Sequence, residues 1–151
     1  MNIEINNKTR NTINTSLIKK VVKIFLAKYK KNNHTVSIAF VGDKTMRTLN
    51  KQYREIDKIT DVMAFPGNVL IKDFIKPEKK NLGEVIINYA QIKRQSRKFN
   101  NSIDQELIFI LVHGLLHLLN YNDTTEKGRK EMEKLGEAII NDQFSMINSP
   151  C

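Results

Sequence analysis

Hydrophobic and polar positions recur along this chain with two different periods. Four short segments alternate with a period of two or form compact apolar runs, as β-strands do, at residues 3–5, 35–41, 61–65 and 85–88. Five longer segments repeat their apolar residues at helical spacing, at about residues 15–31, 43–54, 89–99, 103–119 and 125–142. This mixture predicts an α+β fold class, in which helices cover a small sheet.

Polar residues mark the ends of several predicted helices. Asn14 and the two residues after it offer an N-cap for the first helix, and Asp43 after Gly42 offers one for the second. The segment 103–119 is apolar on nearly all faces, which predicts a buried central helix. Asn120 follows it and can adopt the left-handed conformation that ends a helix.

The length of 151 residues predicts one domain, which we place at residues 1–144, with a frayed tail at 145–151. Cys151 is the single cysteine and lies in that tail, so no internal disulfide is possible. The start of the chain lacks the pattern of a signal peptide, and the longest uncharged apolar stretch, 107–119, is too short to span a bilayer. These features predict a cytoplasmic protein.

The net charge of +9 is concentrated in the first part of the chain. Residues 1–60 hold 13 Lys and Arg against 4 Asp and Glu, whereas residues 61–151 hold 12 of each kind. Such asymmetry is typical of a surface that meets a polyanion, so it favours a nucleic acid as partner over a membrane surface. A solvated lysine-rich surface without any such partner remains an alternative.

His113 and His117 lie four residues apart, so their imidazoles project from the same face of the central helix. This spacing is that of a two-histidine metal clamp, and Asp123 follows the helix closely enough to supply a third ligand. Three protein ligands would leave a position open for water, as in catalytic zinc sites. The alternative is a pair of core histidines with ordinary hydrogen-bond partners. Gly114 disfavours a zinc protease, whose motif has its general-base Glu there.

A second polar cluster surrounds Arg54, at the end of the second predicted helix. Asp57, Thr60 and Asp61 follow it in the turn toward the next strand. These residue types are ordinary in turns, where they satisfy backbone donors and pair with an arginine. An arginine can also hold two phosphate oxygens, which suits a metal-assisted phosphodiester reaction.

Three motifs resemble those of the YbeY family of bacterial endoribonucleases, which are rRNA maturation factors. The family's H-G-x-L-H-L-x-G-Y-D-H is matched at His113, Gly114, Leu116, His117, Leu118 and Tyr121. Its upstream L-N-x-x-Y-R, D and T-(D/N)-V-L-S-F-P are matched at Leu49, Asn50, Tyr53, Arg54, Asp57, Thr60, Asp61, Val62, Phe65 and Pro66. The run 82–84 is similar to the family's L-G-D, so the likeness covers essentially the whole chain.

The resemblance implies a single α+β domain with a mostly four-stranded sheet, about five helices and a metal site in a cleft on the central helix. It places three metal ligands on His113, His117 and Asp123, and a functional arginine on Arg54. The implied cofactor is one divalent metal ion, zinc. The implied activity is cleavage of single-stranded RNA in 16S rRNA 3′-end maturation and ribosome quality control, with rRNA and the small ribosomal subunit as partners and no membrane.

The chain departs from the family at Asp123, where the family has a third histidine. Aspartate is an accepted zinc ligand, but its charge makes a metal-bound water less acidic. The departure keeps a second hypothesis open, a non-catalytic RNA-binding ribosome-assembly factor with a structural or weakened metal site. An iron oxygenase with two histidines and one carboxylate is a third hypothesis, although nothing predicts a cosubstrate pocket. Glu84 and Asp57 are the carboxylates considered as general base.

Overall fold

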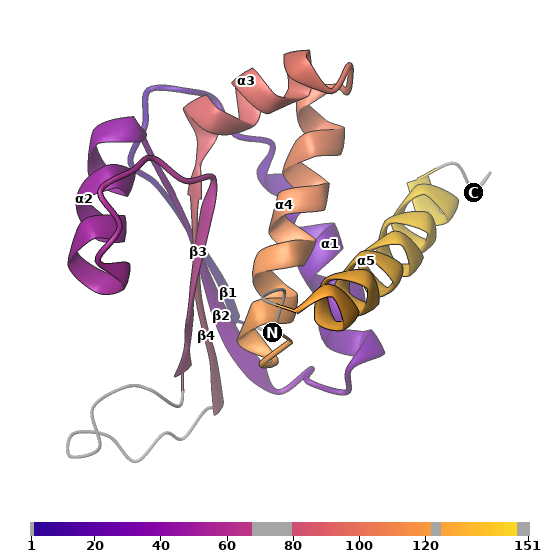
Figure 1. Cartoon of the computed structure of the whole chain (residues 1–151). Helices are drawn as coiled ribbons and strands as arrows, with labels where there is room; N and C mark the ends of the chain where they lie inside the picture. Colours follow the sequence, from indigo (N-terminus) through magenta and orange to yellow (C-terminus); the bar gives the residue numbers. More distant parts are fainter. Residues whose placement is uncertain (1, 68–79, 122–124, 148–151) are drawn as a thin grey trace.

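The computed structural model describes residues 2–67, 80–121 and 125–147 (Figure 1). Within these ranges the strands are β1 (Asn2–Asn7), β2 (His34–Val41), β3 (Val62–Pro66) and β4 (Lys80–Asn88). The helices are α1 (Thr15–Lys28), α2 (Asp43–Arg54), α3 (Tyr89–Lys98), α4 (Ile103–Leu118) and α5 (Glu126–Ile147). The predicted α+β class, with a four-stranded sheet and five helices, is confirmed.

The strands form one mixed sheet in the order β1-β2-β4-β3. β1, β2 and β4 are parallel, and β3 pairs antiparallel with β4, so it is an edge strand of the described sheet. Figure 1 shows α2 on one face of the sheet and α1, α4 and α5 on the other. Alternate residues therefore enter two cores, a large one beneath α1 and α4 and a small one beneath α2.

Several element ends differ from the sequence-based predictions. α1 stops at Lys28 rather than at residue 31, because Lys30 takes a left-handed conformation with φ 56°. β4 begins at Lys80, five positions before the strand predicted at 85–88; residues 68–79 lie outside the described part of the chain. α5 continues to Ile147, so residues 145–147 are helical where a frayed tail was predicted.

The predicted capping role of Asp43 is wrong. Gly42 is the N-cap of α2, and no side chain caps that helix. The Asp43 carboxylate instead accepts hydrogen bonds from Arg94 at 2.6 and 2.9 Å and from Asn88 at 2.8 Å. It therefore ties the first residue of α2 to the N-cap and the middle of α3.

α4 is the buried central helix that the sequence predicts. Ser102 and Gln105 form a reciprocal capping box at its start. The helix contacts β3, β4, α1, α3 and α5. Gly114 permits its close approach to the sheet, since a Cβ there would lie 2.7 Å from Val85 Cγ1 and 3.1 Å from Val62 Cγ2. The helix can thus hold its C-terminal half against the edge strand.

Candidate active site

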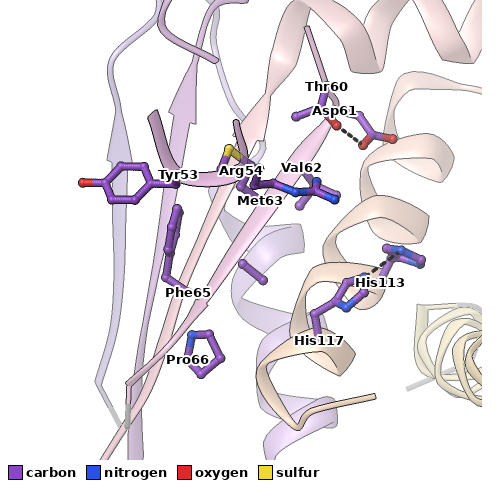
Figure 2. A pocket seen from close by; sticks show the side chains of 11 residues that line it. Tyr53, Arg54, Thr60, Asp61, Val62, Met63, Phe65, Pro66, His113 and His117 are labelled. Carbon is purple, nitrogen blue, oxygen red and sulfur yellow. Dashed lines mark hydrogen bonds between the residues drawn. The ribbon is translucent and has the colours of Figure 1, made fainter. Parts of the chain in front are cut away.

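His113 and His117 extend from adjacent turns of α4, and both side chains are half-buried. Their Nε2 atoms lie 3.1 Å apart, with the rings 77° to each other (Figure 2). Two nitrogens bound to one tetrahedral zinc at ordinary Zn–N distances would be about 3.3 Å apart. The pair is therefore spaced as two ligands of one metal ion.

The end of α4 fixes the orientation of His117. Asn120 has the predicted left-handed conformation, with φ 68°. The Tyr121 N–H then donates to the Leu116 carbonyl at 3.2 Å, and the Asn120 N–H to the His117 carbonyl at 2.9 Å, which is the Schellman arrangement. This turn brings the Tyr121 carbonyl oxygen to 3.1 Å from His117 Nδ1.

That contact determines which nitrogen of His117 is protonated. A carbonyl oxygen can only accept, so Nδ1 is the donor and, in the neutral ring, Nε2 carries the lone pair. The lone pair is directed toward His113 Nε2. Metal-binding histidines commonly have their second nitrogen held by a backbone carbonyl in this way.

Asp123, the predicted third ligand, lies outside the described residues. Within the described ranges, no cluster of three His, Cys, Asp or Glu side chains is placed to hold a metal ion. The structure thus supplies two nitrogens with the spacing of zinc ligands, one of them, on His117, in the tautomer that can bind a metal ion. The assignment of Asp123 stays a prediction.

Arg54 lies in the same cleft as the histidines, although 59 positions separate it from His113 in the sequence. The cleft has a volume of about 460 Å³. Figure 2 shows the Arg54 side chain extending from the end of α2 toward the two imidazoles on α4. Of the four predicted site residues, the structure brings these three together.

The cleft crosses the outer edge of β3. The residues that line it are Tyr53, Arg54, Thr60, Asp61, Val62, Met63, Ala64, Phe65, Pro66, His113 and His117. Val62 and Ala64 pack into the core under α4, whereas Met63 and Phe65 pack into the core under α2. One end of the cleft therefore belongs to α4 and the other to α2.

Asn88 anchors the wall formed by Thr60 and Asp61. This fully buried side chain caps α3 and donates to the Thr60 carbonyl at 3.3 Å. Its backbone N–H donates to the Asp61 carbonyl at 2.8 Å. The predicted strand 85–88 ends at Asn88, for which no role was predicted; its position just before a predicted helix was the available signal. The hydrogen bond from Arg94, supported by Asn88, lowers the pKa of the Asp43 carboxyl in the same network.

The two carboxylates considered as general base do not line the cleft. Asp57 accepts a hydrogen bond from Arg47 Nε at 2.8 Å, which lowers the pKa of Asp57, and this pair borders a separate shallow surface on α2. Glu84 lies on β4 opposite Phe65. Asp61 is the carboxylate among the described cleft-lining residues. From the sequence, Asp61 was expected at the junction of turn and strand and as part of the family motif, without a chemical role of its own.

A second groove continues past His113. It has a volume of about 230 Å³ and shares Asp61 and His113 with the first cleft. Phe109 on α4 and Arg129 on α5 also line it. The two hollows therefore adjoin at Asp61 and His113.

The fold is that of a solved protein. The chain is similar to the solution structure of TM1509 from Thermotoga maritima, with a TM-score of 0.63 and 24% identity, over 95% of this chain and 90% of that one. The class defined by fold and site is thus a small α+β protein with a histidine pair in a cleft at the edge of its sheet.

The chain belongs to the endoribonuclease YbeY family, whose model matches residues 2–143. It is 36% identical over 149 residues to the endoribonuclease YbeY of Mycoplasmopsis synoviae (strain 53), covering 89% of this chain and 94% of that protein. The Thermoanaerobacter sp. (strain X514) relative of the same name is 34% identical over 152 residues, covering 93% and 96%. The family predicted from the motifs is confirmed.

Over the part of the chain that the structure describes, every helix is too short or too polar to cross a lipid bilayer.

Proposed function

We propose that this protein is an endoribonuclease that hydrolyses single-stranded RNA with a divalent metal ion, zinc, held by His113, His117 and Asp123. The observation that carries the proposal is the imidazole pair, with Nε2 atoms 3.1 Å apart, in a cleft that also holds Arg54. Family membership supports the substrate and the reaction, since the relatives are named endoribonucleases.

Each described residue has a distinct part in this mechanism. A bound zinc ion would supply Lewis acidity and an acidified water. Tyr121 holds His117 in the tautomer whose Nε2 can ligate. Arg54 binds the non-bridging oxygens of the scissile phosphate and stabilises the charge that grows there, an effect worth about 3 kcal/mol for one such contact in other enzymes. Asp61, the carboxylate among the described cleft-lining residues, would accept the proton that the attacking water loses.

The physiological substrate that we propose is ribosomal RNA, processed at the 16S 3′ end on the small ribosomal subunit in the cytoplasm. The excess positive charge of residues 1–60 supports a polyanionic partner of this size, because lysines along the surface would replace counterions on the RNA backbone. Binding should therefore weaken steeply as salt is raised.

A non-catalytic RNA-binding factor is the second candidate, because a structural metal could tie the end of α4 to the start of α5. Asp123 in place of a histidine favours it, since the added negative charge lowers the acidity of a bound water. Elemental analysis of the gently purified protein, with cleavage of single-stranded RNA measured with and without chelator, separates the two. The binder would keep its affinity and yield no products.

The experiment that tests the enzyme is the variant His113→Ala. We expect it to lose both the bound metal and RNA cleavage, because one of two described ligand nitrogens is removed. His34→Ala is the matched control, since His34 is the third histidine of the chain, lies at the start of β2 and does not line the cleft. An unchanged cleavage rate in a metal-free His113→Ala protein would contradict the mechanism.

A further inference from the structure

We propose that Tyr53 and Phe65 form a stacking site for one unpaired nucleobase, next to the phosphate held by Arg54. The inference rests on the proposed function for the identity of the ligand, an RNA strand. It adds a feature to that function: a site on the protein that selects single strands over duplexes.

The first observation is the exposure of Tyr53. This aromatic side chain is 59% exposed, in the last turn of α2. Its ring packs edge-to-face on Phe65, with centroids 5.2 Å apart and the planes at 72°. The contact holds Tyr53 in place while leaving a ring face accessible, which is the requirement for stacking with a base.

The second observation is the position of the pair within the cleft. Tyr53 and Phe65 line the same 460 Å³ hollow as the two histidines. In Figure 2 the aromatic rings lie on one side of β3 and the imidazoles on the other, with the Arg54 side chain reaching between them. A phosphate beside Arg54 would thus have a histidine pair on one side and an aromatic pair on the other.

The third observation is the order of side chains at the end of α2. Tyr53 and Arg54 are neighbours in the sequence, and Figure 2 shows them pointing in different directions from the same turn. One nucleotide presents a charged phosphate and a flat base that also point apart. The two side chains therefore match the two chemical parts of a single nucleotide, a fork-shaped donor for the phosphate and a ring for the base.

Such a site discriminates between single strands and duplexes. A base in a helix has both faces covered by its neighbours, whereas an unpaired base can turn outward and stack on an aromatic side chain. Stacking does not depend on base identity, so the site would select for strandedness rather than for sequence.

The test measures binding of a short single-stranded RNA that carries one 2-aminopurine, whose fluorescence is quenched by stacking. Chelator is present so that the RNA stays intact, and cleavage kinetics are then measured on the metal-loaded protein. The variants are Tyr53→Leu, which removes the ring, and Tyr53→Phe, which keeps it. Phe99→Leu is the matched control, because Phe99 is 57% exposed but does not line the cleft.

We expect Tyr53→Leu to weaken single-strand binding by about five- to a hundredfold and to raise KM by a similar factor, the range found for loss of one stacked base. The 2-aminopurine quenching should disappear, and the preference for single-stranded over duplex RNA should fall. Tyr53→Phe and Phe99→Leu should both bind as the unaltered protein does.

Two results would overturn the proposal. One is binding and quenching by Tyr53→Leu equal to those of the unaltered protein, since the Tyr53 ring would then make no stacking contact with the base. The other is an equal loss in Phe99→Leu. If the unaltered protein binds RNA through Tyr53 but never cleaves it, the stacking site stands and the enzymatic function fails.

Discussion

The two ends of the cleft are built from helices of opposite character. α4 has ten buried residues among sixteen and packs against β3, β4 and three other helices. α2 has twelve residues, of which two, Met46 and Asn50, are buried. The histidines thus extend from the best-packed helix of the described protein, whereas Arg54 and Tyr53 extend from the end of a surface helix.

The difference assigns a separate task to each end. A metal site needs ligand atoms fixed within a fraction of an ångström, and side chains that extend from a closely packed helix meet that need. A substrate contact needs reach and solvent access, which Arg54 and Tyr53 have at the end of α2. We therefore expect substitutions on α4 to change metal binding and the stability of the fold. Substitutions at the end of α2 should change RNA binding and cleavage without loss of metal.

Among the substitutions that test this division, Arg54→Glu should have the largest effect, on the rate of RNA cleavage. Replacing the guanidinium by a carboxylate removes the phosphate contact and adds repulsion, so we expect cleavage to fall at least a hundredfold. Metal content should be unchanged, because Arg54 is on the α2 side of the cleft. Cleavage kinetics and elemental analysis of the same preparation measure both.

Lys51→Glu is the matched control for charge. It makes the same change of net charge one turn earlier on α2, at a residue that borders the separate shallow surface. A small, salt-sensitive loss there would reflect the general attraction of a basic surface for RNA. Loss of metal in Arg54→Glu would contradict the division between the two ends, since Arg54 would then be part of the metal site's support.

The sequence predicted α4 well because its signals are local. The apolar run, the paired spacing of His113 and His117, and the helix-ending Asn120 all lie within a few residues of one another. Periodicity and capping chemistry act at that range, so the buried helix, its left-handed end and the shared face of the histidines followed from the sequence.

The α2 side of the cleft was less predictable because its contacts are long-range. The Asp43 carboxylate was expected to cap its own helix but instead accepts from Arg94, 51 positions away. Asn88 holds the Thr60 carbonyl from 28 positions away. Tyr53 and Phe65 were noted only as parts of a motif, since nothing local indicates that their rings meet. Tertiary packing decided these partners.

Two glycines, Gly114 in α4 and Gly136 in α5, allow the packing of α4 to be tested through the stability of the fold. Gly114→Ala should destabilise the protein, because its Cβ would meet Val85 Cγ1 at 2.7 Å in a core of stiff β-branched side chains. Overpacking of this kind costs about 1–3 kcal/mol, which exceeds the gain of up to about 1 kcal/mol from better helix propensity. The free energy of unfolding in denaturant measures the change.

Gly136→Ala is the control for that variant and should have the opposite sign. Gly136 lies inside α5, and a Cβ there would meet Val112 Cγ1 at 3.7 Å, an ordinary contact. We expect a gain of about 0.5–1 kcal/mol, since only the propensity term remains. If both variants changed the free energy of unfolding by the same amount, α4 would not be tightly packed on the sheet at Gly114. The close approach of the two would then not explain how the histidines are positioned.

Asp43→Asn, on the α2 side, should have the smallest effect, a change in how the free energy of unfolding depends on pH. The hydrogen bonds from Arg94 lower the pKa of Asp43 in the folded protein, so the carboxylate stabilises the fold above its unfolded pKa of about 3.9. That contribution is lost as the pH falls through the lower, folded pKa. The Arg94 and Asp43 side chains are 47% and 37% exposed, so the effect should stay below about 1 kcal/mol.

Unfolding in denaturant at about pH 7 and about pH 3 measures this difference. Asp43→Asn should be less stable than the unaltered protein at the higher pH, and the difference should narrow at the lower pH. Asp57→Asn removes a similar ion pair with Arg47 that joins α2 only to the loop after it, so its effect should be smaller still. A gap that widened toward acid would reverse the sign of the argument. The network would then not be what holds α2, and with it Arg54, at the cleft.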